Sequence, residues 1–216
     1  HDVARAYVLY REKRSQERAQ AAAKAPATAE ATMFAVENGV RVPLDAAKLA
    51  TLVESACIGL GEQVSAKAII EPTLRDLYDG VPMDEVRKSV ILSARSLIEK
   101  DPAYSYVTAR LLLNTVRHEV LGEEVAQADM ASRYAEYFPE FIKKGIAAEL
   151  LDEKLAQFDL ARLGAALKAE RDEQFGYLGL QTLYDRYFLH IEDRRIELPQ
   201  AFFMRVAMGL ALNEID

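Results

Sequence analysis

Apolar residues recur every three or four positions between residues 45 and 121, and this spacing constrains the fold more than any other feature of the sequence. One stripe consists of Leu49, Leu52, Val53, Ala56, Cys57 and Leu60, and another consists of Val86, Val90, Ile91, Ala94, Leu97 and Ile98. Such spacing predicts helices that each bury one face against a core. The sequence therefore predicts a mainly α-helical fold.

Capping and helix-breaking residues divide this region into four expected helices. The expected start signals are Asp45, Ser65, Pro82 with Asp84, and Asp101 with Pro102, and the expected stop signals are Gly59, Gly61, Gly80 and Gly122. Aspartate and serine cap helix N-termini, proline fits the first helical position, and glycine ends helices. Pro72 lies inside the second helix, which it should kink or divide because it lacks a backbone N–H.

Two short apolar runs lie between Met33 and Pro43 and are separated by Asn38-Gly39. Both residues of this pair tolerate positive φ, as a two-residue hairpin turn requires. The sequence therefore predicts a β-hairpin before the four helices.

After Glu123 the sequence becomes richer in aromatic residues, and shorter helices are expected. Their ranges are Met130–Phe138, Phe141–Leu150, Leu155–Leu167, Tyr177–Tyr187 and Phe202–Leu212. A second hairpin is expected from Phe188–Ile191 and Arg195–Leu198 around Glu192–Arg194. The aromatic residues Tyr134, Tyr137, Phe138 and Phe141 have helical spacing, which favours a core or an interface over an aromatic binding platform.

Cysteine and histidine are scarce, which limits the chemistry that the chain can perform. The only cysteine, Cys57, cannot form an internal disulfide, and three histidines without further cysteines do not form a zinc pattern. Cys57 is interpreted as a small core residue, and His190 as a surface residue of a strand rather than a ligand. No nucleophile–base pair or paired carboxylate stands out, so no catalytic, cofactor-binding or metal-binding residue is expected.

The formal net charge of −7 disfavours a general nucleic-acid surface, and no apolar run is long enough to suggest a membrane helix. The first 24 residues carry six Lys/Arg and three Asp/Glu, a local net charge of +3 that is interpreted as a solvated helix face. No signal peptide is recognised, and the low cysteine content indicates a reducing, cytoplasmic setting. Because the sequence begins at His1, we expect it to be a segment of a longer protein.

Several motifs resemble the large subunit of class I ribonucleotide reductase. The corner Tyr78-Asp79-Gly80 and the run Asp101–Leu111 resemble the second half of the ATP-cone domain of that subunit. The segment Phe175–Tyr177, the helix with Tyr184-Asp185-Arg186-Tyr187, and the run Pro199–Met208 resemble the helical opening of its catalytic domain. Several elements in the same order are more specific than one motif.

This resemblance implies a division of the chain into four parts. Residues 1–18 are similar to the closing helix of a preceding ATP-cone, and residues 19–32 form an Ala-rich linker. Residues 33–122 resemble a degenerate ATP-cone, with four helices and a small β-hairpin cap. Residues 123–216 resemble the helical N-terminal part of the catalytic domain, with one further β-hairpin.

The resemblance also implies the function of the parent protein, which is reduction of ribonucleoside diphosphates by a cysteine radical. The implied partners are the remainder of the large subunit, a radical-generating small subunit and further copies of the parent, and the implied allosteric effectors are ATP and dATP. The family's radical cysteine and redox cysteine pair lie further along the chain, so this segment alone is expected to be inert.

The cone itself departs from the family pattern where phosphates should bind. Val36-Glu37 replaces a Lys-Arg pair, Met83 and Arg87 replace Thr and His, and Glu119 stands where the family has a Lys. Arg87 and Arg117 remain as cations, but Glu37 should repel a triphosphate. We therefore expect that this cone keeps its fold and no longer binds ATP or dATP.

Two alternatives to this interpretation stay open at the level of sequence. One is a free-standing helical module that binds nucleotides or another protein, although the apolar residues of the last helix favour a larger assembly. The other is an ATP-cone transcription regulator, which would require a zinc-binding cysteine set that this sequence lacks.

Overall fold

The computed structural model describes residues 33–214, of which residues 34–214 belong to one compact unit. The closing helix expected at residues 1–18 and the linker expected at residues 19–32 lie outside the described residues. The described chain is mainly helical and contains two small sheets, so the expected fold class is confirmed.

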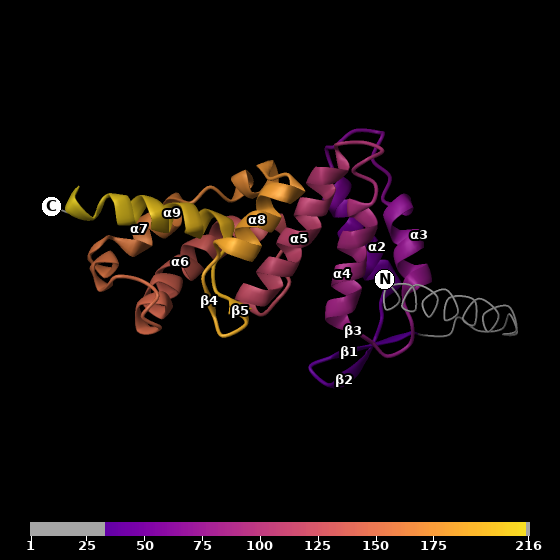
Figure 1. Cartoon of the computed structure of the whole chain (residues 1–216), viewed down its shortest axis with the longest axis horizontal. Coiled ribbons are helices and arrows are strands. Elements are labelled where there is room, and N and C mark those ends of the chain that lie inside the picture. Colours follow the sequence, from indigo (N-terminus) through magenta and orange to yellow (C-terminus); the bar gives the residue numbers. More distant parts are fainter. Residues whose placement is uncertain (1–32, 215–216) are drawn as a thin grey trace, which may run out of the picture. The chain divides into compact units, whose positions relative to one another are not determined.

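A three-stranded sheet begins the described chain (Figure 1). Strand β1 (Phe34–Glu37) pairs antiparallel with β2 (Val40–Pro43), and Asn38 and Gly39 between them have φ of 51° and 78°. This hairpin confirms the expectation from the Asn-Gly turn. The third strand, β3 (Val81–Pro82), pairs in parallel with β1 and is not predicted from the sequence, because two residues show no alternating pattern.

Four helices follow the capping signals between residues 45 and 122. They are α2 (Ala46–Cys57), α3 (Lys67–Asp76), α4 (Met83–Arg95) and α5 (Tyr104–Leu121). The Asp45 carboxylate accepts from the Lys48 N–H at 3.0 Å, as expected of an N-cap. Gly122 ends α5 with φ of 79°, a conformation that glycine adopts without a Cβ clash.

One helix in this region differs from the sequence expectation, and another is continuous across the proline that was expected to kink or divide it. Helix α2 ends at Cys57 rather than at Leu60, because the chain turns away through Gly59 and Gly61 with positive φ. Helix α3 is not divided at Pro72 but continues through it to Asp76. Tertiary packing therefore outweighs the loss of one backbone hydrogen bond at the proline.

Beyond α5 the chain forms short helices and one small hairpin. The elements are η1 (Gln127–Asp129), α6 (Met130–Ala147), η2 (Glu153–Gln157), α7 (Leu160–Ala166), η3 (Ala169–Gln174), α8 (Tyr177–Arg186), β4 (His190–Ile191), β5 (Arg194–Arg195), α9 (Pro199–Leu210) and η4 (Leu212–Glu214).

Three expectations for this half require correction. Helix α6 runs without a break through Pro139, where two helices were expected. The single helix expected at 155–167 is instead η2 and α7, because Asp159 caps α7 by accepting from the Arg162 N–H at 3.0 Å. The second hairpin is present but shorter, with two-residue strands around Glu192 and Asp193, and Glu192 has φ of 53°.

Helix α5 connects the two halves of the described chain. It contacts α2 and α4 on one side and α8, η3 and β5 on the other (Figure 1). Its buried residues accordingly cover more than one face: Tyr104, Val107, Thr108, Ala109, Leu111, Leu112, Leu113, Val116 and Arg117. A helix with buried residues on more than one face is typical of the interior of a larger core. The predicted domain boundary at residues 122–123 therefore falls directly after a helix that packs against both halves.

None of the described helices is long and apolar enough to cross a membrane.

Candidate functional site

A cavity of about 700 Å³ lies among α2, α4, α5 and the chain that follows α5. Its volume falls within the range of roughly 300–1,000 Å³ that is usual for small-molecule sites. Apolar side chains form much of its wall, including Leu49, Leu52, Val86, Val90 and Leu111. These residues belong to the same helical stripes that the sequence predicts, and the cavity forms where the stripes meet.

Helix α5 contributes the polar part of the wall. Arg110, Asn114 and Arg117 line the cavity from successive turns of this helix. Their spacing of four and three residues places them on one helical face. Arg110 also donates to the backbone oxygens of Ala56 and Ile58 at 3.1 and 2.7 Å, which fixes its guanidinium at the end of α2.

Each of the four cations that line the cavity is paired with a carboxylate. The pairs are Lys48–Glu124 at 2.7 Å, Arg87–Glu37 at 2.9 Å, Arg110–Glu173 at 3.7 Å and Arg117–Asp172 at 3.1 Å. Each carboxylate offsets the positive charge that an added anion would meet. The cavity therefore offers no unpaired positive charge from its own wall.

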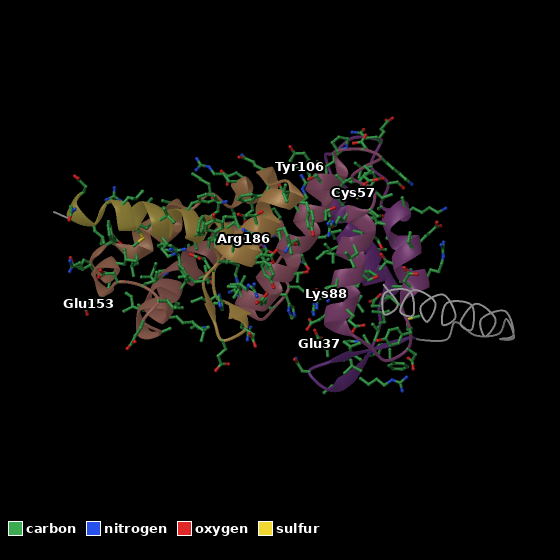
Figure 2. The ribbon with its side chains drawn as sticks, in the orientation of Figure 1. Glu37, Cys57, Lys88, Tyr106, Glu153 and Arg186 are labelled. Carbon is green, nitrogen blue, oxygen red and sulfur yellow. The ribbon has the colours of Figure 1, made fainter. Side chains whose placement is uncertain are left out.

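A second cavity, of about 270 Å³, lies beside the turn of the first hairpin. Figure 2 shows Glu37 at this strand end of the structure, below α4. Arg87 donates to the Glu37 carboxylate at 2.9 Å and to the Asp84 carboxylate at 3.0 Å, and its Nη2 lies 3.1 Å from Nε2 of His118. With only 12% of its side chain exposed, Arg87 is held by two carboxylates in a partly buried position. This arrangement is poorly suited to bind a further anion.

The structure brings together most of the residues at which the sequence departs from the family pattern. Val36, Glu37, Met83 and Arg87 all line the smaller cavity, although they come from separate elements. These four positions therefore lie together in the folded chain. His118 completes this group and was not singled out in the sequence, because nothing in its own helix links it to the hairpin.

Arg117 and Glu119, the other two residues noted in the comparison with the family pattern, do not line the smaller cavity. Arg117 lines the larger cavity, but its guanidinium donates to Asp172 at 3.1 Å. Glu119 lies away from both cavities and accepts from the Tyr184 hydroxyl at 2.7 Å and from the Arg195 N–H at 2.6 Å. The last turn of α5 directs Glu119 toward α8 and β5, so the expectation that it faces the phosphate position requires correction.

A buried polar network around Asp172 could not be found from the sequence. Its carboxylate accepts from Arg117, from the Tyr134 hydroxyl at 2.9 Å and from the Gln200 amide at 2.8 Å. These residues come from α5, η3, α6 and α9, and Asp172 is 2% exposed. Burial raises the pKa of Tyr134 well above its ordinary range. The expectation that Tyr134 is a core residue is confirmed, whereas its hydrogen-bonding role depends on tertiary contacts.

Cys57 and His190 show no features of a reactive site. Cys57 is half-buried at the end of α2, and Figure 2 places it at the opposite end of the first half from Glu37. Burial raises the pKa of the Cys57 thiol, which disfavours the reactive thiolate. His190 is exposed on β4, as expected of a strand surface residue. Within residues 33–214, no three His, Cys, Asp or Glu side chains are grouped to hold a metal ion.

Comparison with known proteins places these features in a family context. The family described as "Ribonucleotide reductase, all-alpha domain" matches residues 173–216, which include α8, the second hairpin and α9.

Relatives match over a much larger part of the chain. The ribonucleoside-diphosphate reductase subunit alpha of Chlamydia trachomatis is 38% identical over 99% of this chain and 21% of its own length. The corresponding subunit of Helicobacter pylori is 37% identical over 82% of this chain and 22% of its own length. The large subunit of Danio rerio is 28% identical over 78% of this chain and 21% of its own length. The chain thus spans about a fifth of the length of these relatives.

Proposed function

Because this chain matches the N-terminal region of the ribonucleotide reductase large subunit, we propose that it serves as a regulatory and structural region of a ribonucleoside-diphosphate reductase. The parent protein would reduce ribonucleoside diphosphates to deoxyribonucleotides. The match to reductase alpha subunits over 99% of the chain supports this assignment.

Within this region, residues 33–122 would form an ATP-cone that no longer binds ATP or dATP. The observation that carries this proposal is the ion pair between Arg87 and Glu37, with His118 beside it. In the ATP-cones that this chain resembles, a Lys-Arg pair occupies the position of Val36-Glu37, just before the hairpin turn. Here a carboxylate stands at that position and neutralises the nearest cation, so a triphosphate of ATP or dATP would meet repulsion rather than two positive charges.

The partners of this region would be the remainder of the large subunit, further copies of the parent protein and a radical-generating small subunit in the cytoplasm. The surface of α9 supports the first of these. Phe203, Val206 and Leu210 are 49%, 40% and 84% exposed and lie at the helical spacing of one face. An apolar face of this kind is typical of a surface that a larger assembly covers.

Calorimetric titration of the 216-residue chain with ATP and with dATP tests the loss of nucleotide binding. The variant Val36→Lys/Glu37→Arg restores two cations at the hairpin and is expected to gain binding, while the unaltered chain shows no heat of binding. A matched control is Val40→Lys/Glu54→Arg, which makes the same change in charge at exposed positions outside both cavities.

Micromolar binding of ATP by the unaltered chain would refute the proposed loss. Equal gains in the hairpin variant and in the control would instead point to a nonspecific charge effect, and would also count against the proposed role of Glu37.

A further inference from the structure

Polar contacts hold the last turns of α5 on two sides. Arg117 donates from Nη2 to the Asp172 carboxylate of η3 at 3.1 Å, and these side chains are 5% and 0% exposed. Two residues further along, the Glu119 carboxylate accepts from the Tyr184 hydroxyl of α8 at 2.7 Å and from the Arg195 N–H of β5 at 2.6 Å. An α-helix turns by about 100° per residue, so Arg117 and Glu119 lie about 200° apart around the helix axis. We call these five residues the clamp.

The hairpin of β4 and β5 is also fixed to the backbone of α5. Arg194 donates from Nε to the Glu119 carbonyl oxygen at 2.7 Å, in the last turn of the helix, where backbone acceptors lack helical partners. Arg195 donates from Nε to the Tyr184 carbonyl oxygen at 3.3 Å, and its guanidinium lies 4.2 Å from the centre of the Tyr184 ring. The hairpin therefore contacts both α5 and α8 through defined polar groups (Figure 1).

The covalent connection after α5 does not by itself make the joint between the two halves rigid. Gly122 has φ of 79°, and Glu123 and Glu124 after it are exposed. Residues at the end of an element are the usual position of hinges, and glycine tolerates a wide range of backbone angles. Apolar packing around α5 is non-directional, whereas the hydrogen bonds of the clamp require fixed partners and angles. The clamp thus supplies a constraint that the connection lacks.

We propose that the clamp locks this joint, so that residues 34–121 and 123–214 move as one rigid body. A displacement of the first half would then be passed to the hairpin and to α9, which begins at Pro199 shortly after β5. Glu119 stands where the family has a Lys, and a lysine could not accept the two hydrogen bonds that this carboxylate accepts. The inference goes beyond the proposed function and does not depend on whether the cone binds a nucleotide.

Distances between two spin labels measure the rigidity of the joint. In the 216-residue chain, Cys57→Ala removes the only cysteine, and Glu54→Cys in α2 and Lys144→Cys in α6 place one label on each half at exposed positions. Double electron–electron resonance should give one narrow distance distribution for this labelled chain. Glu119→Ala removes one side of the clamp, and we expect a broader distribution that includes additional populations.

Hydrogen exchange tests whether the contact forms in solution. The Glu119 carboxylate protects the Arg195 amide, so exchange of this amide should become about tenfold faster in Glu119→Ala. Glu119→Lys should have the same effect, because lysine has no acceptor. Tyr184→Phe leaves the bond to Arg195 in place and should have a smaller effect. The matched control is Glu71→Ala, which removes an exposed carboxylate that pairs with Lys67 on α3 and should change neither measurement.

Each remaining outcome counts for or against the clamp. A broad distribution in the labelled chain with the clamp intact would overturn the rigid joint, and unchanged exchange at Arg195 in Glu119→Ala would show that the contact does not form. Faster exchange with an equally narrow distribution would also overturn the inference, because Glu119 would then hold only the hairpin. If circular dichroism shows that Glu119→Ala loses helix, the measurements are made on Glu119→Gln, which keeps one acceptor oxygen. A smaller broadening there supports the clamp, and no broadening overturns it.

Discussion

Replacing Asp172 with asparagine should destabilise the described fold by about 3–5 kcal/mol, because it breaks a buried ion pair and leaves one partner behind. Asp172 is 2% exposed, and the side chain of Arg117 is 5% exposed. Asparagine would place an amide donor among groups that already donate, namely the hydroxyl of Tyr134 and the amide of Gln200. The Nε of Arg117 has no partner even in the intact network, and the remaining partner of its guanidinium is the uncharged Gln127 carboxamide oxygen, which cannot balance the positive charge.

Urea unfolding followed by circular dichroism measures this loss, and thermal unfolding should show a decrease in Tm of roughly 6–20 °C for a chain of this length. The matched control is Asp193→Asn, which changes an exposed aspartate in the turn of the second hairpin. Its effect should stay within about 0.5 kcal/mol.

The double variant Asp172→Leu/Arg117→Met tests whether the loss of stability comes from the unpaired charge of Arg117. If the unpaired charge causes the loss, removing both charges should cost less than Asp172→Asn alone. The reasoning would be refuted by a cost below about 1 kcal/mol for Asp172→Asn. It would also be refuted if the double variant lost at least as much stability as the two single variants together.

Three further predictions concern helix capping and pH. Asp45→Ala removes the cap of α2 and should lower the free energy of unfolding by about 1 kcal/mol in urea titrations; no loss would contradict the capping role. Hydrogen bonds from the Phe34 N–H and from Arg41 lower the pKa of Asp79. The stabilising contribution of the Asp79 carboxylate is therefore present above the ordinary pKa of an aspartate and is lost as pH falls. Acid unfolding of Asp79→Asn should therefore depend less steeply on pH below about 4, and identical acid profiles would exclude this contribution. Burial and the hydrogen bond to Glu119 raise the pKa of Tyr184 from 10.0 to about 12, so the unfolded chain ionises first and stability should fall across this interval. Tyr184→Phe should show a smaller fall, as measured by thermal unfolding at each pH; an equal fall would contradict the assignment.

Local signals in the sequence were sufficient for the elements that depend on a few neighbouring residues. Asp45 caps α2, Asn38-Gly39 forms the hairpin turn, and Gly122 ends α5, each as its own chemistry predicts. Local rules failed where packing opposes them. Pro139 lies inside the continuous helix α6, where a break was expected, since burial of a helical stripe outweighs one missing hydrogen bond.

The candidate site likewise combines positions that the sequence identified with contacts that only the folded chain shows. The sequence identified Glu37 and Arg87 as positions where the family pattern changes, but it could not show that they form an ion pair with each other. It placed Glu119 with them because the family has a phosphate-facing Lys at this position. The hydroxyl of Tyr184 and the N–H of Arg195 decide where that side chain lies, and both come from the other half of the described chain.

The sequence by itself determined the helical class, the hairpin turns, the helix ends set by Asp45 and Gly122, and the resemblance to the reductase large subunit. These properties depend on spacing and on the conformational preferences of single residues, which act over a few positions. The tertiary structure alone decided that β3 pairs with β1, that Arg87 pairs with Glu37 and that Asp172 joins four elements. Such properties require contacts between residues far apart in the chain, and a hydrogen bond or ion pair forms only when folding brings both partners within about 3 Å.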